Sequence, residues 1–340
     1  MKRIGYIFDK IVDIENIKFA ILKSSKGKTK RKSVQKVLKD IDTHALLIQE
    51  MLVNKTYVPC EPRIMIRKDS NNKKDRQITL TKYFPDKIIH WCLVLALESV
   101  MLKGMYKYNV GNVKGRGIKY GKEYIERFLH NDKSVRYALK LDISKYYHNI
   151  DKTILLNQFA RKIKCNDTLE LLDKVLLTSK GIPIGFYTSQ WFANFYLEGL
   201  DHFIKEKLKV KYYIRYVDDM LLVGNNKRKM WKDYIKINDY LNKELKLDLK
   251  SNYQLFNLGK EHVSMLGFQF FKHKRTRLRK HIFLKIKATL SKLKYNVNKK
   301  YIDRLTAYYG WCVYIKNYYI TKGDLKLWQI KSDKLTTLLN

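Results

Sequence analysis

Hydrophobic residues occupy every second position between Val135 and Asp142. A period of two is typical of a β-strand with one buried face, so the sequence predicts a strand that ends at Asp142. Two more short strands are predicted at Tyr212–Tyr216 and Met220–Val223. The few residues between these two strands indicate a tight turn.

A helical pattern begins near Thr188 and Ser189, either of which can cap the first turn through its hydroxyl. The residues that follow form one apolar face at helical spacing: Phe192, Phe195, Tyr196, Gly199, Leu200 and Phe203. We interpret this face as core packing and not as a ligand surface. Residues 135–271 therefore combine strands with helices.

Two β-prone runs precede this region, Arg63–Lys68 and Arg76–Leu80, and the polar segment Asp69–Asp75 separates them. Asn, Asp and Ser between two such runs predict a hairpin, whose loop carries Lys73 and Lys74. The rest of residues 1–134 is basic and mostly helical in pattern.

The C-terminal region opens with a strongly basic stretch. From Phe271 to Lys300 there are 12 Lys and Arg residues and no Asp or Glu. An amphipathic basic helix is typical of binding to nucleic acid or to a membrane surface. The aromatic-rich stretch Tyr308–Tyr319 that follows suits packing, or stacking on sugars and bases. The apolar stripe of the predicted helix consists of Leu278, Ile282, Phe283, Ile286, Leu290 and Leu293.

The composition adds a strong charge bias to this pattern. The 340 residues include 70 Lys and Arg against 32 Asp and Glu, a formal net charge of +38, while hydrophobic residues make up 45%. That hydrophobic fraction is sufficient for a sizeable core, and the charge predicts a polyanionic partner. A lysine-rich genome would explain part of the Lys excess, although such genomes usually add Glu as well.

Several protein classes are excluded by the same sequence. The first ten residues lack the apolar segment of a signal peptide. The longest apolar run, within Trp91–Leu102, contains Glu98 and falls far short of the roughly 20 residues of a membrane span. The cysteines are scattered without metal-ligand spacing, which argues against a disulfide framework or a zinc site and fits a reducing cytoplasm: Cys60, Cys92, Cys165 and Cys312.

Three carboxylates stand out chemically. Asp142 ends an apolar strand, and Asp218 and Asp219 are adjacent in the predicted turn. Neighbouring carboxylates repel each other unless cations lie between them, and two divalent ions about 3.5–4 Å apart are the usual device for phosphoryl transfer. The alternative is a solvated turn, because Asp is common in turns.

Five motifs in a fixed order decide between these readings: LDISKYYHNI (Leu141–Ile150), GIPIGFYTSQWFANFYL (Gly181–Leu197), YVDD (Tyr216–Asp219), LDLK (Leu247–Lys250) and MLGF (Met265–Phe268). Together they resemble the palm motifs of reverse transcriptases, from about Arg63 to Lys280. The resemblance implies an α+β right-hand polymerase with helical fingers at residues 1–134, a palm with an RRM-like sheet at 135–271 and a small, basic helical thumb at 272–340.

The resemblance also implies roles for the carboxylates. Asp142 and Asp218 would hold two Mg²⁺ ions, with help from the carbonyl of Ile143, and Asp219 would be the supporting acid. Mn²⁺ is an alternative ion. The substrates implied are dNTPs, an RNA template or non-coding RNA, and the DNA product.

Other matched positions would contact the incoming nucleotide. Tyr147 falls on the aromatic gate that excludes a ribose 2′-hydroxyl, although an ordinary core aromatic is the alternative. Arg76, together with Lys74 or Lys73, would grip the triphosphate, unless these residues are only a solvated loop. The remaining matches to nucleotide-binding positions are Ile184, Gly185, Gln190 and Lys250.

A further set would bind nucleic acid. Arg116 lies in a GRG that matches a template-contacting stretch. Met265, Leu266, Gly267 and Phe268 match the primer grip. We expect the basic helix to follow the phosphates of a template–primer duplex through Lys285, Lys287, Lys292 and Lys294.

The IGFYTSQ segment at Ile184–Gln190 is similar to that of diversity-generating retroelement enzymes, in which Ile in place of Gln accompanies relaxed fidelity at template adenines. A defence-associated bacterial enzyme that acts with a non-coding RNA is the second interpretation, and unconventional priming or templating is left open for it. A non-catalytic RNA-binding protein is the third, and the intact Asp142, Asp218, Asp219 and Tyr147 argue against it. We expect a bacterial or phage-encoded cytoplasmic protein without a membrane partner; a small basic helical accessory protein or self-association is left open.

Overall fold

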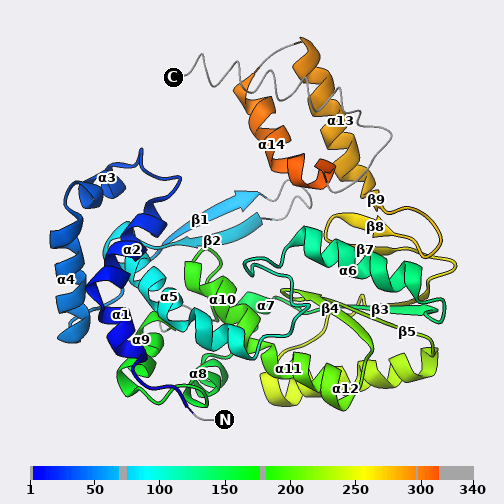
Figure 1. Ribbon diagram of the computed structural model, residues 1–340, viewed down its shortest axis with the longest axis horizontal. Coiled ribbons are helices and arrows are strands. Elements are labelled where there is room, and N and C mark those ends of the chain that lie inside the picture. Colours follow the sequence, from blue (N-terminus) through cyan, green and yellow to red (C-terminus); the bar gives the residue numbers. More distant parts are fainter. Residues whose placement is uncertain (1–2, 69–74, 177–180, 296–297, 314–340) are drawn as a thin grey trace.

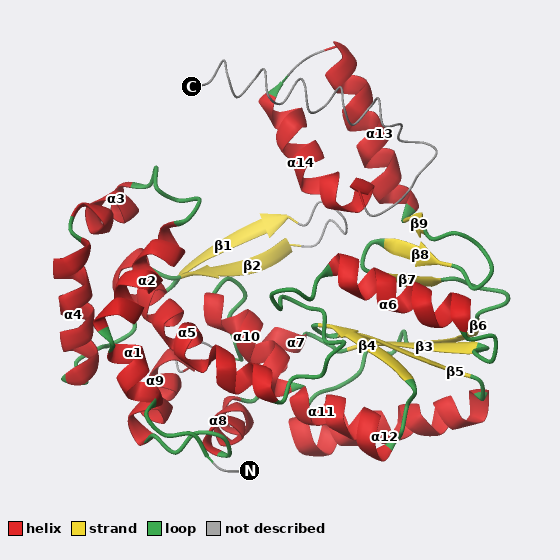
Figure 2. Ribbon diagram, viewed as in Figure 1, coloured by secondary structure: helices red, strands yellow, loops and turns green. Residues whose placement is uncertain are grey.

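The computed structural model describes residues 3–68, 75–176, 181–295 and 298–313. The fold is mixed α/β, as the sequence pattern predicts. A helical N-terminal part adjoins a central antiparallel sheet, and a pair of C-terminal helices projects beyond the sheet (Figure 1, Figure 2).

Helices build most of the N-terminal part. Asp13 and Asp40 accept hydrogen bonds from the first-turn amides of Asn16 and Thr43, and so cap two of these helices. The long helix α5 (Ile88–Lys103) is apolar on nearly all its faces, and it is buried against α1, α2 and α10. The helices before it are α1 (Ile7–Val12), α2 (Ile14–Ser25), α3 (Lys32–Lys39) and α4 (Ile41–Val53).

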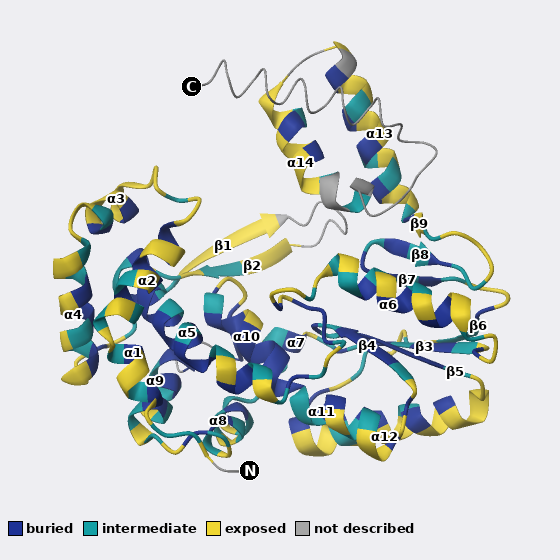
Figure 3. Ribbon diagram, in the orientation of Figure 1, coloured by how far each residue is buried: buried dark blue, intermediate teal, exposed yellow. Residues whose placement is uncertain are grey.

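The predicted hairpin is confirmed. Strands β1 (Arg63–Lys68) and β2 (Asp75–Leu80) pair antiparallel, and the short segment η1 (Tyr83–Lys87) leads from them into α5. Most of the hairpin is exposed (Figure 3). Lys73 and Lys74, expected in its loop, lie outside the described residues.

The central sheet has the strand order β4-β5-β3-β6, and every pairing is antiparallel. Its strands are β3 (Tyr137–Asp142), β4 (Tyr212–Tyr216), β5 (Asp219–Gly224) and β6 (Gln254–Asn257). The predicted strands are therefore confirmed, with Asp219 as the first residue of β5. Strand β3 lies inside the sheet, so its end, at Asp142, has a neighbour on either side.

Two hydrophobic cores lie on the two faces of this sheet. Alternation along β3 sends Leu139 into one core and Ala138 into the other. The first core includes α10 (Tyr187–Tyr196), α11 (Glu198–His202) and α12 (Lys227–Leu245), and the second is covered by α6 (Ile118–Asn131) (Figure 3). The remaining helical segments are α7 (Tyr146–Asn149), α8 (Lys152–Ala160), α9 (Asn166–Leu176) and η2 (Phe203–Lys207).

The predicted cap of the central helix is wrong. Helix α10 begins at Tyr187, and Phe186 stands at the cap position without a side-chain hydrogen bond. Ser189 instead donates its hydroxyl to the carbonyl of Pro183, 2.6 Å away, which fixes the turn before the helix. The apolar face is confirmed as core, although the chain divides it between α10, α11 and η2.

The C-terminal part carries a small sheet and two helices. Strands β7 (Val263–Met265), β8 (Phe268–Phe270) and β9 (Arg277–Leu278) pair in sequence order and pack under α6. Helices α13 (Lys280–Tyr295) and α14 (Lys299–Val313) then pack against each other. The predicted stripe is confirmed from Ile282 onward, because Ile282, Ile286 and Leu293 are buried in the second core, but its first member, Leu278, is wrong for the helix and lies in β9. Within the described ranges, no helix is long and apolar enough to cross a membrane.

Candidate active site

The three predicted carboxylates meet where β3 and β5 pair. Asp142 lies directly opposite Asp219 in the β3–β5 register, which places their side chains on the same face of the sheet. Asp218 belongs to the two-residue loop between β4 and β5, because Tyr216 pairs with Asp219. Residues that are far apart in the sequence are thus brought to one end of the sheet.

The loop that carries Asp218 has an unusual backbone. Val217 has a φ of 58°, in the left-handed region that β-branched residues rarely adopt. A two-residue hairpin loop needs a positive φ to match the twist of its strands, and glycine or asparagine is the usual residue there. Such strain persists only where the surroundings enforce it, and it is concentrated at functional sites.

The environment disfavours the charged forms of Asp218 and Asp219. Burial, and then the charge of Asp142, raises the pKa of Asp218 to about 7, while Lys250 opposes the shift. Burial also raises the pKa of Asp219 to about 6, with Lys140 opposing. These shifts mark a place where negative charges lie close together with too little positive charge to balance them.

Two lysines supply part of the positive charge that balances these carboxylates. The ammonium of Lys250 donates to Asp142 Oδ2 at 2.6 Å, and Lys140 Nζ lies 3.6 Å from Asp219 Oδ1. Strand-like pairing brings Lys250 to this place, because Ile143 bridges to Leu249 and the amide of Lys250 donates to the carbonyl of Asp142. The LDLK motif is therefore held beside Asp142 by its backbone.

The donor set fits a divalent cation. Asp142 Oδ1 and Asp219 Oδ1 are buried, and neither accepts a hydrogen bond from any residue that the structure describes. Ionised carboxylate oxygens can only accept, and hard cations such as Mg²⁺ prefer oxygen ligands. Among the described residues, no group of three or more His, Cys, Asp or Glu side chains is already gathered as a metal-binding cluster.

Tyr147 lies beside the carboxylates. Its side chain is half-buried in α7, and burial followed by the charge of Asp218 raises the pKa of Tyr147 to about 12. The carbonyl of Tyr147 accepts a hydrogen bond from the amide of Ile182. Gly181 makes this approach possible, since a Cβ there would lie 2.3 Å from the carbonyl oxygen of His148.

The following residues of the same segment contact the hairpin. The carbonyl of Ile184 accepts a hydrogen bond from the amide of Thr79 in β2, at 2.7 Å. Gly185 has a φ of 123°, and a Cβ there would lie 2.3 Å from the carbonyl oxygen of Thr79, so only glycine fits. The Ile184 side chain is 43% exposed, and Gln190 is exposed on α10.

A match to a known family decides what this arrangement is. Residues 66–270 match the family described as reverse transcriptase (RNA-dependent DNA polymerase). The chain belongs to the reverse transcriptase family. The matched residues include all three aspartates, Tyr147 and the hairpin strand β2.

Solved structures with a similar fold are telomerases. This reverse transcriptase is 13% identical to the apo telomerase of Candida tropicalis, with a TM-score of 0.50, 68% of this chain covered and 52% of that one. It is 12% identical to the Candida albicans telomerase in complex with a TWJ fragment of telomeric RNA, with a TM-score of 0.48 and coverage of 69% and 51%. The chain thus spans about half the length of either structure, and the first likeness shows a shared fold alone. No curated protein matched this sequence.

The remaining predicted positions of the reverse transcriptase are more dispersed. Arg76 is exposed on β2, opposite Arg67. Arg116 is half-buried, and its guanidinium donates to the carbonyl of Tyr106 at 3.0 Å. On α13, Lys287 and Lys292 are exposed and Lys285 is half-buried, while the side chain of Lys294 lies outside the description. Their contacts with nucleic acid remain predictions.

The MLGF motif forms the tight turn between β7 and β8. Leu266 and Gly267 both have positive φ values, of 55° and 88°, as a two-residue hairpin turn requires. Met265 and Phe268 are fully buried, so only the backbone of the turn remains to meet a primer. Trp311 of α14 covers it, donating its indole N–H to the carbonyl of Leu266.

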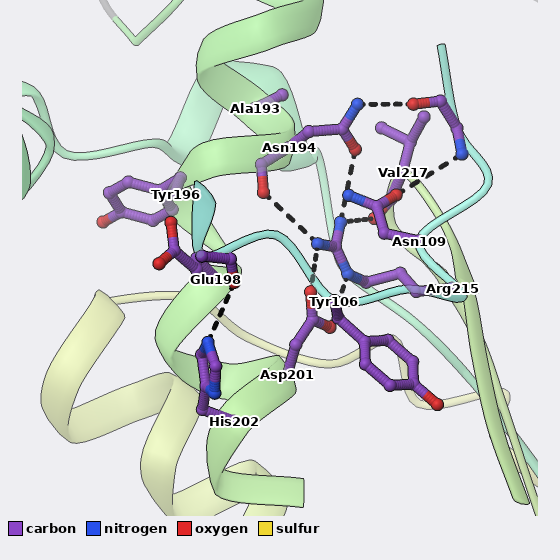
Figure 4. Close-up of polar contacts among 12 residues, drawn as sticks. Tyr106, Asn109, Ala193, Asn194, Tyr196, Glu198, Asp201, His202, Arg215 and Val217 are labelled. Atoms are coloured by element: carbon purple, nitrogen blue, oxygen red, sulfur yellow. Dashed lines mark hydrogen bonds and ion pairs between the residues drawn. The ribbon is translucent and has the colours of Figure 1, made fainter. Parts of the chain in front are cut away.

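Sequence reasoning missed a buried polar network under the turn that carries Asp218 (Figure 4). Arg215 is fully buried and pairs with buried Asp201 through two hydrogen bonds, at 2.8 and 2.5 Å. The same guanidinium donates to the carbonyl of Asn194 and, at 2.9 Å, to the carbonyl of Val217. An arginine within the otherwise apolar run YYIRY was the available signal, since arginine is almost never fully buried without a partner.

Proposed function

We propose that the chain synthesises DNA on an RNA template with two Mg²⁺ ions held by Asp142 and Asp218, Mn²⁺ being the alternative ion. The observation that supports this most directly is the pair of buried oxygens on Asp142 and Asp219 that accept no hydrogen bond from the described residues, next to a turn whose Asp218 has a raised pKa. The ions would activate the primer 3′-hydroxyl and stabilise the charge of the transferred phosphoryl group.

The residues of the chain have separate tasks in this proposal. Tyr147, half-buried beside Asp218, excludes a 2′-hydroxyl by its bulk. Lys250, already 2.6 Å from Asp142, offsets negative charge on the departing pyrophosphate. Arg76 on the exposed hairpin reaches the triphosphate, as Lys74 or Lys73 would beside it. The fingers, palm and thumb correspond to residues 1–134, 135–271 and 272–340.

The first test is primer extension on an RNA template with dNTPs and Mg²⁺. Asp218→Ala should abolish extension, because the loss of a carboxylate that holds both ions disrupts the two-metal site. The variant should fold at least as well as the wild type, since it removes a charge that burial and Asp142 disfavour. Asp239→Ala, which removes an exposed aspartate from α12, is the matched control. Near wild-type extension by Asp218→Ala would refute the assignment.

For the subgroup, we propose a template-copying retroelement enzyme with relaxed fidelity. Support comes from Ile184, whose exposed apolar side chain adjoins the hairpin and offers no hydrogen bond to a nucleotide. Ile184→Gln should lower the error frequency opposite template adenines, as read by sequencing the DNA products. An unchanged error spectrum would count against this subgroup and in favour of the defence-associated interpretation.

A further inference from the structure

Lys140 lies in strand β3, two residues before Asp142, so the two side chains point to the same face of the central sheet. The strand has a neighbour on both sides here, because Lys140 pairs with Leu221 of β5 and with Gln254 of β6. Its side chain is only 21% exposed. A lysine that is covered to this extent costs stability unless its ammonium finds partners. The partners of Lys140 therefore indicate what its charge is used for.

The ammonium of Lys140 has two partners from distant parts of the chain. Nζ donates a hydrogen bond to the carbonyl of Ser264 in β7 at 2.9 Å, and it lies 3.6 Å from Asp219 Oδ1. Among the residues that the structure describes, Lys140 is the cation that forms an ion pair with Asp219. One positive charge thus joins the small C-terminal sheet to the third carboxylate of the site.

Ser264 is a rigid anchor for this ammonium. It pairs with Gln269 in the neighbouring strand β8. Val263 and Met265 on either side of it are fully buried, so the backbone at Ser264 cannot shift without disturbing the second core. The position of the Lys140 ammonium is therefore set by the fold and does not depend on a substrate.

The carboxylate of Asp219 is less constrained. Pairing with Asp142 and Tyr216 fixes the backbone of Asp219 but not the torsion angles of its side chain. Because Oδ1 accepts no hydrogen bond from the described residues, the nearby charge of Lys140 is what favours one orientation. The orientation matters, since a reacting group displaced by about 1 Å can cost about 100-fold in rate.

Lys250 provides a contrast, because it also contacts a carboxylate of the site. Its ammonium pairs with Asp142 while 40% of the side chain is exposed, so it can turn toward a departing pyrophosphate. Lys140 is less exposed, and a backbone carbonyl holds its ammonium on the side away from Asp219. Such a group is suited to keeping a neighbour in place and not to following a substrate.

We propose that Lys140 is a positioning residue: anchored on the carbonyl of Ser264, its ammonium holds the Asp219 carboxylate in the orientation that the polymerase reaction needs. Lys140 acts through Asp219 and touches neither the nucleotide nor the primer. The inference rests on the proposed function, in which Asp219 supports the two-metal site.

The test measures kcat and KM for primer extension on an RNA template with the full chain. Lys140→Met keeps the length of the side chain and removes its charge. Its kcat should fall about 10- to 100-fold, while KM for the primed template and for dNTPs should change by less than about threefold, because Lys140 contacts neither. Lys140→Arg keeps a positive charge and several N–H donors, and it should recover most of the lost kcat.

The matched control is Lys122→Met, which removes another half-buried lysine that forms an ion pair, with Glu126 on α6 at 2.7 Å. It should leave kcat unchanged. An equal fall of kcat in Lys122→Met and Lys140→Met would mean that the loss of any such ion pair slows the enzyme, and would overturn the inference.

A double-mutant cycle with Asp219→Asn shows whether the two residues act as a unit. In the Asp219→Asn background, Lys140→Met should lower the single-turnover rate by no more than about threefold, because the charge that Lys140 holds is already gone. Losses that multiply would show that Lys140 acts independently of Asp219. If Lys140→Met does not fold, Lys140→Gln takes its place in the cycle, since its amide can still donate to a carbonyl.

Two further results would overturn the inference. Wild-type kcat in Lys140→Met would show that Asp219 keeps its orientation alone. A higher KM for the primed template at unchanged kcat would make Lys140 a nucleic-acid contact. Failure of the wild-type chain to extend any primer would instead refute the proposed function.

Discussion

Arg215 donates a hydrogen bond from Nη1 to the carbonyl of Val217, 2.9 Å away, and so ties the strained turn that carries Asp218 to the core. The rest of the guanidinium is engaged by Asp201 and Asn194, and the Asn194 side chain in turn donates to the carbonyl of Gly111 (Figure 4). A positive φ at Val217 is thereby enforced by a group two residues away. The orientation of Asp218 depends on this contact.

The first prediction separates the effect of Arg215 on the position of Asp218 from its effect on the stability of the fold. Removing Arg215 alone would leave the buried charge of Asp201 without its ion-pair partner, with the Tyr213 hydroxyl still donating to it, at a cost of about 3–5 kcal/mol. Replacing both ion-pair partners by apolar residues is often neutral, so we expect Arg215→Met/Asp201→Leu to lose much less stability than Arg215→Met, although the buried Tyr213 hydroxyl then loses its acceptor. The kcat of this double variant for primer extension should still fall about 10- to 100-fold, because the released turn misplaces Asp218 by a fraction of an ångström.

The control for this prediction is Lys162→Met/Glu198→Leu, which replaces another ion pair of the palm, one that does not contact the turn. It should change kcat little. The required Mg²⁺ concentration should rise only in the Arg215 double variant, a readout that a purely structural role would not move. Wild-type kcat and Mg²⁺ dependence in that variant would show that the turn holds its shape without Arg215.

The second prediction concerns the choice of sugar. Tyr147→Val should open space beside Asp218 and raise the ratio of ribonucleotide to deoxyribonucleotide incorporation by at least about tenfold, because a steric exclusion is lost. Single-nucleotide kcat/KM values for paired rNTPs and dNTPs measure this ratio. Tyr253→Val, at a half-buried tyrosine packed on Tyr234, is the control and should leave it unchanged. If Tyr147→Val kept the wild-type ratio of ribonucleotide to deoxyribonucleotide incorporation, the sugar gate would have to lie elsewhere.

The sequence predicted most of the fold because local patterns were strong. Alternation located β3, two polar segments located the hairpins, and the stripe around Ile286 located α13. The capping error at Ser189 has a tertiary cause. Its hydroxyl is used by the carbonyl of Pro183, a partner that propensity alone cannot reveal.

The candidate site was predicted to a similar extent. Asp142, Asp218 and Asp219 could be placed together because their motifs resemble those of reverse transcriptase palms, and the β3–β5 register agrees. Long-range polar contacts could not be placed. Arg215 and Asp201 are 14 residues apart and reach each other only because α11 packs on the sheet, so their pairing needed the structure. Burial of Met265 and Phe268 likewise depends on packing around β7 and β8.

The third prediction tests the basic face of α13. Because Ile282, Ile286 and Leu293 supply the buried packing of this helix, the helix should stay folded when its lysines are replaced. Replacing them by Gln should weaken binding of a template–primer duplex at every sequence and flatten its log–log salt slope by about 1–3. The extension rate at saturating nucleic acid should change little. The four substitutions are Lys285→Gln, Lys287→Gln, Lys292→Gln and Lys294→Gln.

The control removes four exposed lysines from α12 instead: Lys227→Gln, Lys232→Gln, Lys236→Gln and Lys243→Gln. It carries the same change of charge on a helix at the other face of the central sheet (Figure 1). A salt slope that is lowered equally in both variants would mean that overall charge, and not α13, attracts the duplex.

The fourth prediction concerns the stability of the fold in acid. His90 in α5 is buried against Phe186, its Nδ1 has no hydrogen-bond partner in the described chain, and burial followed by the charge of Lys87 lowers its pKa to about 3. Between pH 6.5 and 3 the unfolded chain binds a proton at this histidine and the folded chain does not. Stability must therefore fall as the pH drops through this window, by about 2 kcal/mol at pH 5 from this one group.

Urea unfolding of the wild type and His90→Phe at pH 7.5 and pH 5 isolates this contribution. Both proteins lose stability in acid through their other groups, so the informative quantity is the difference between their free energies of unfolding. That difference should shift by about 2 kcal/mol in favour of His90→Phe on going to pH 5, because phenylalanine cannot take up a proton. Exchange of the exposed His148 for Phe should produce no such shift. If the His90 difference is the same at both pH values, the histidine is protonated within the fold, and α5 must supply it with an acceptor.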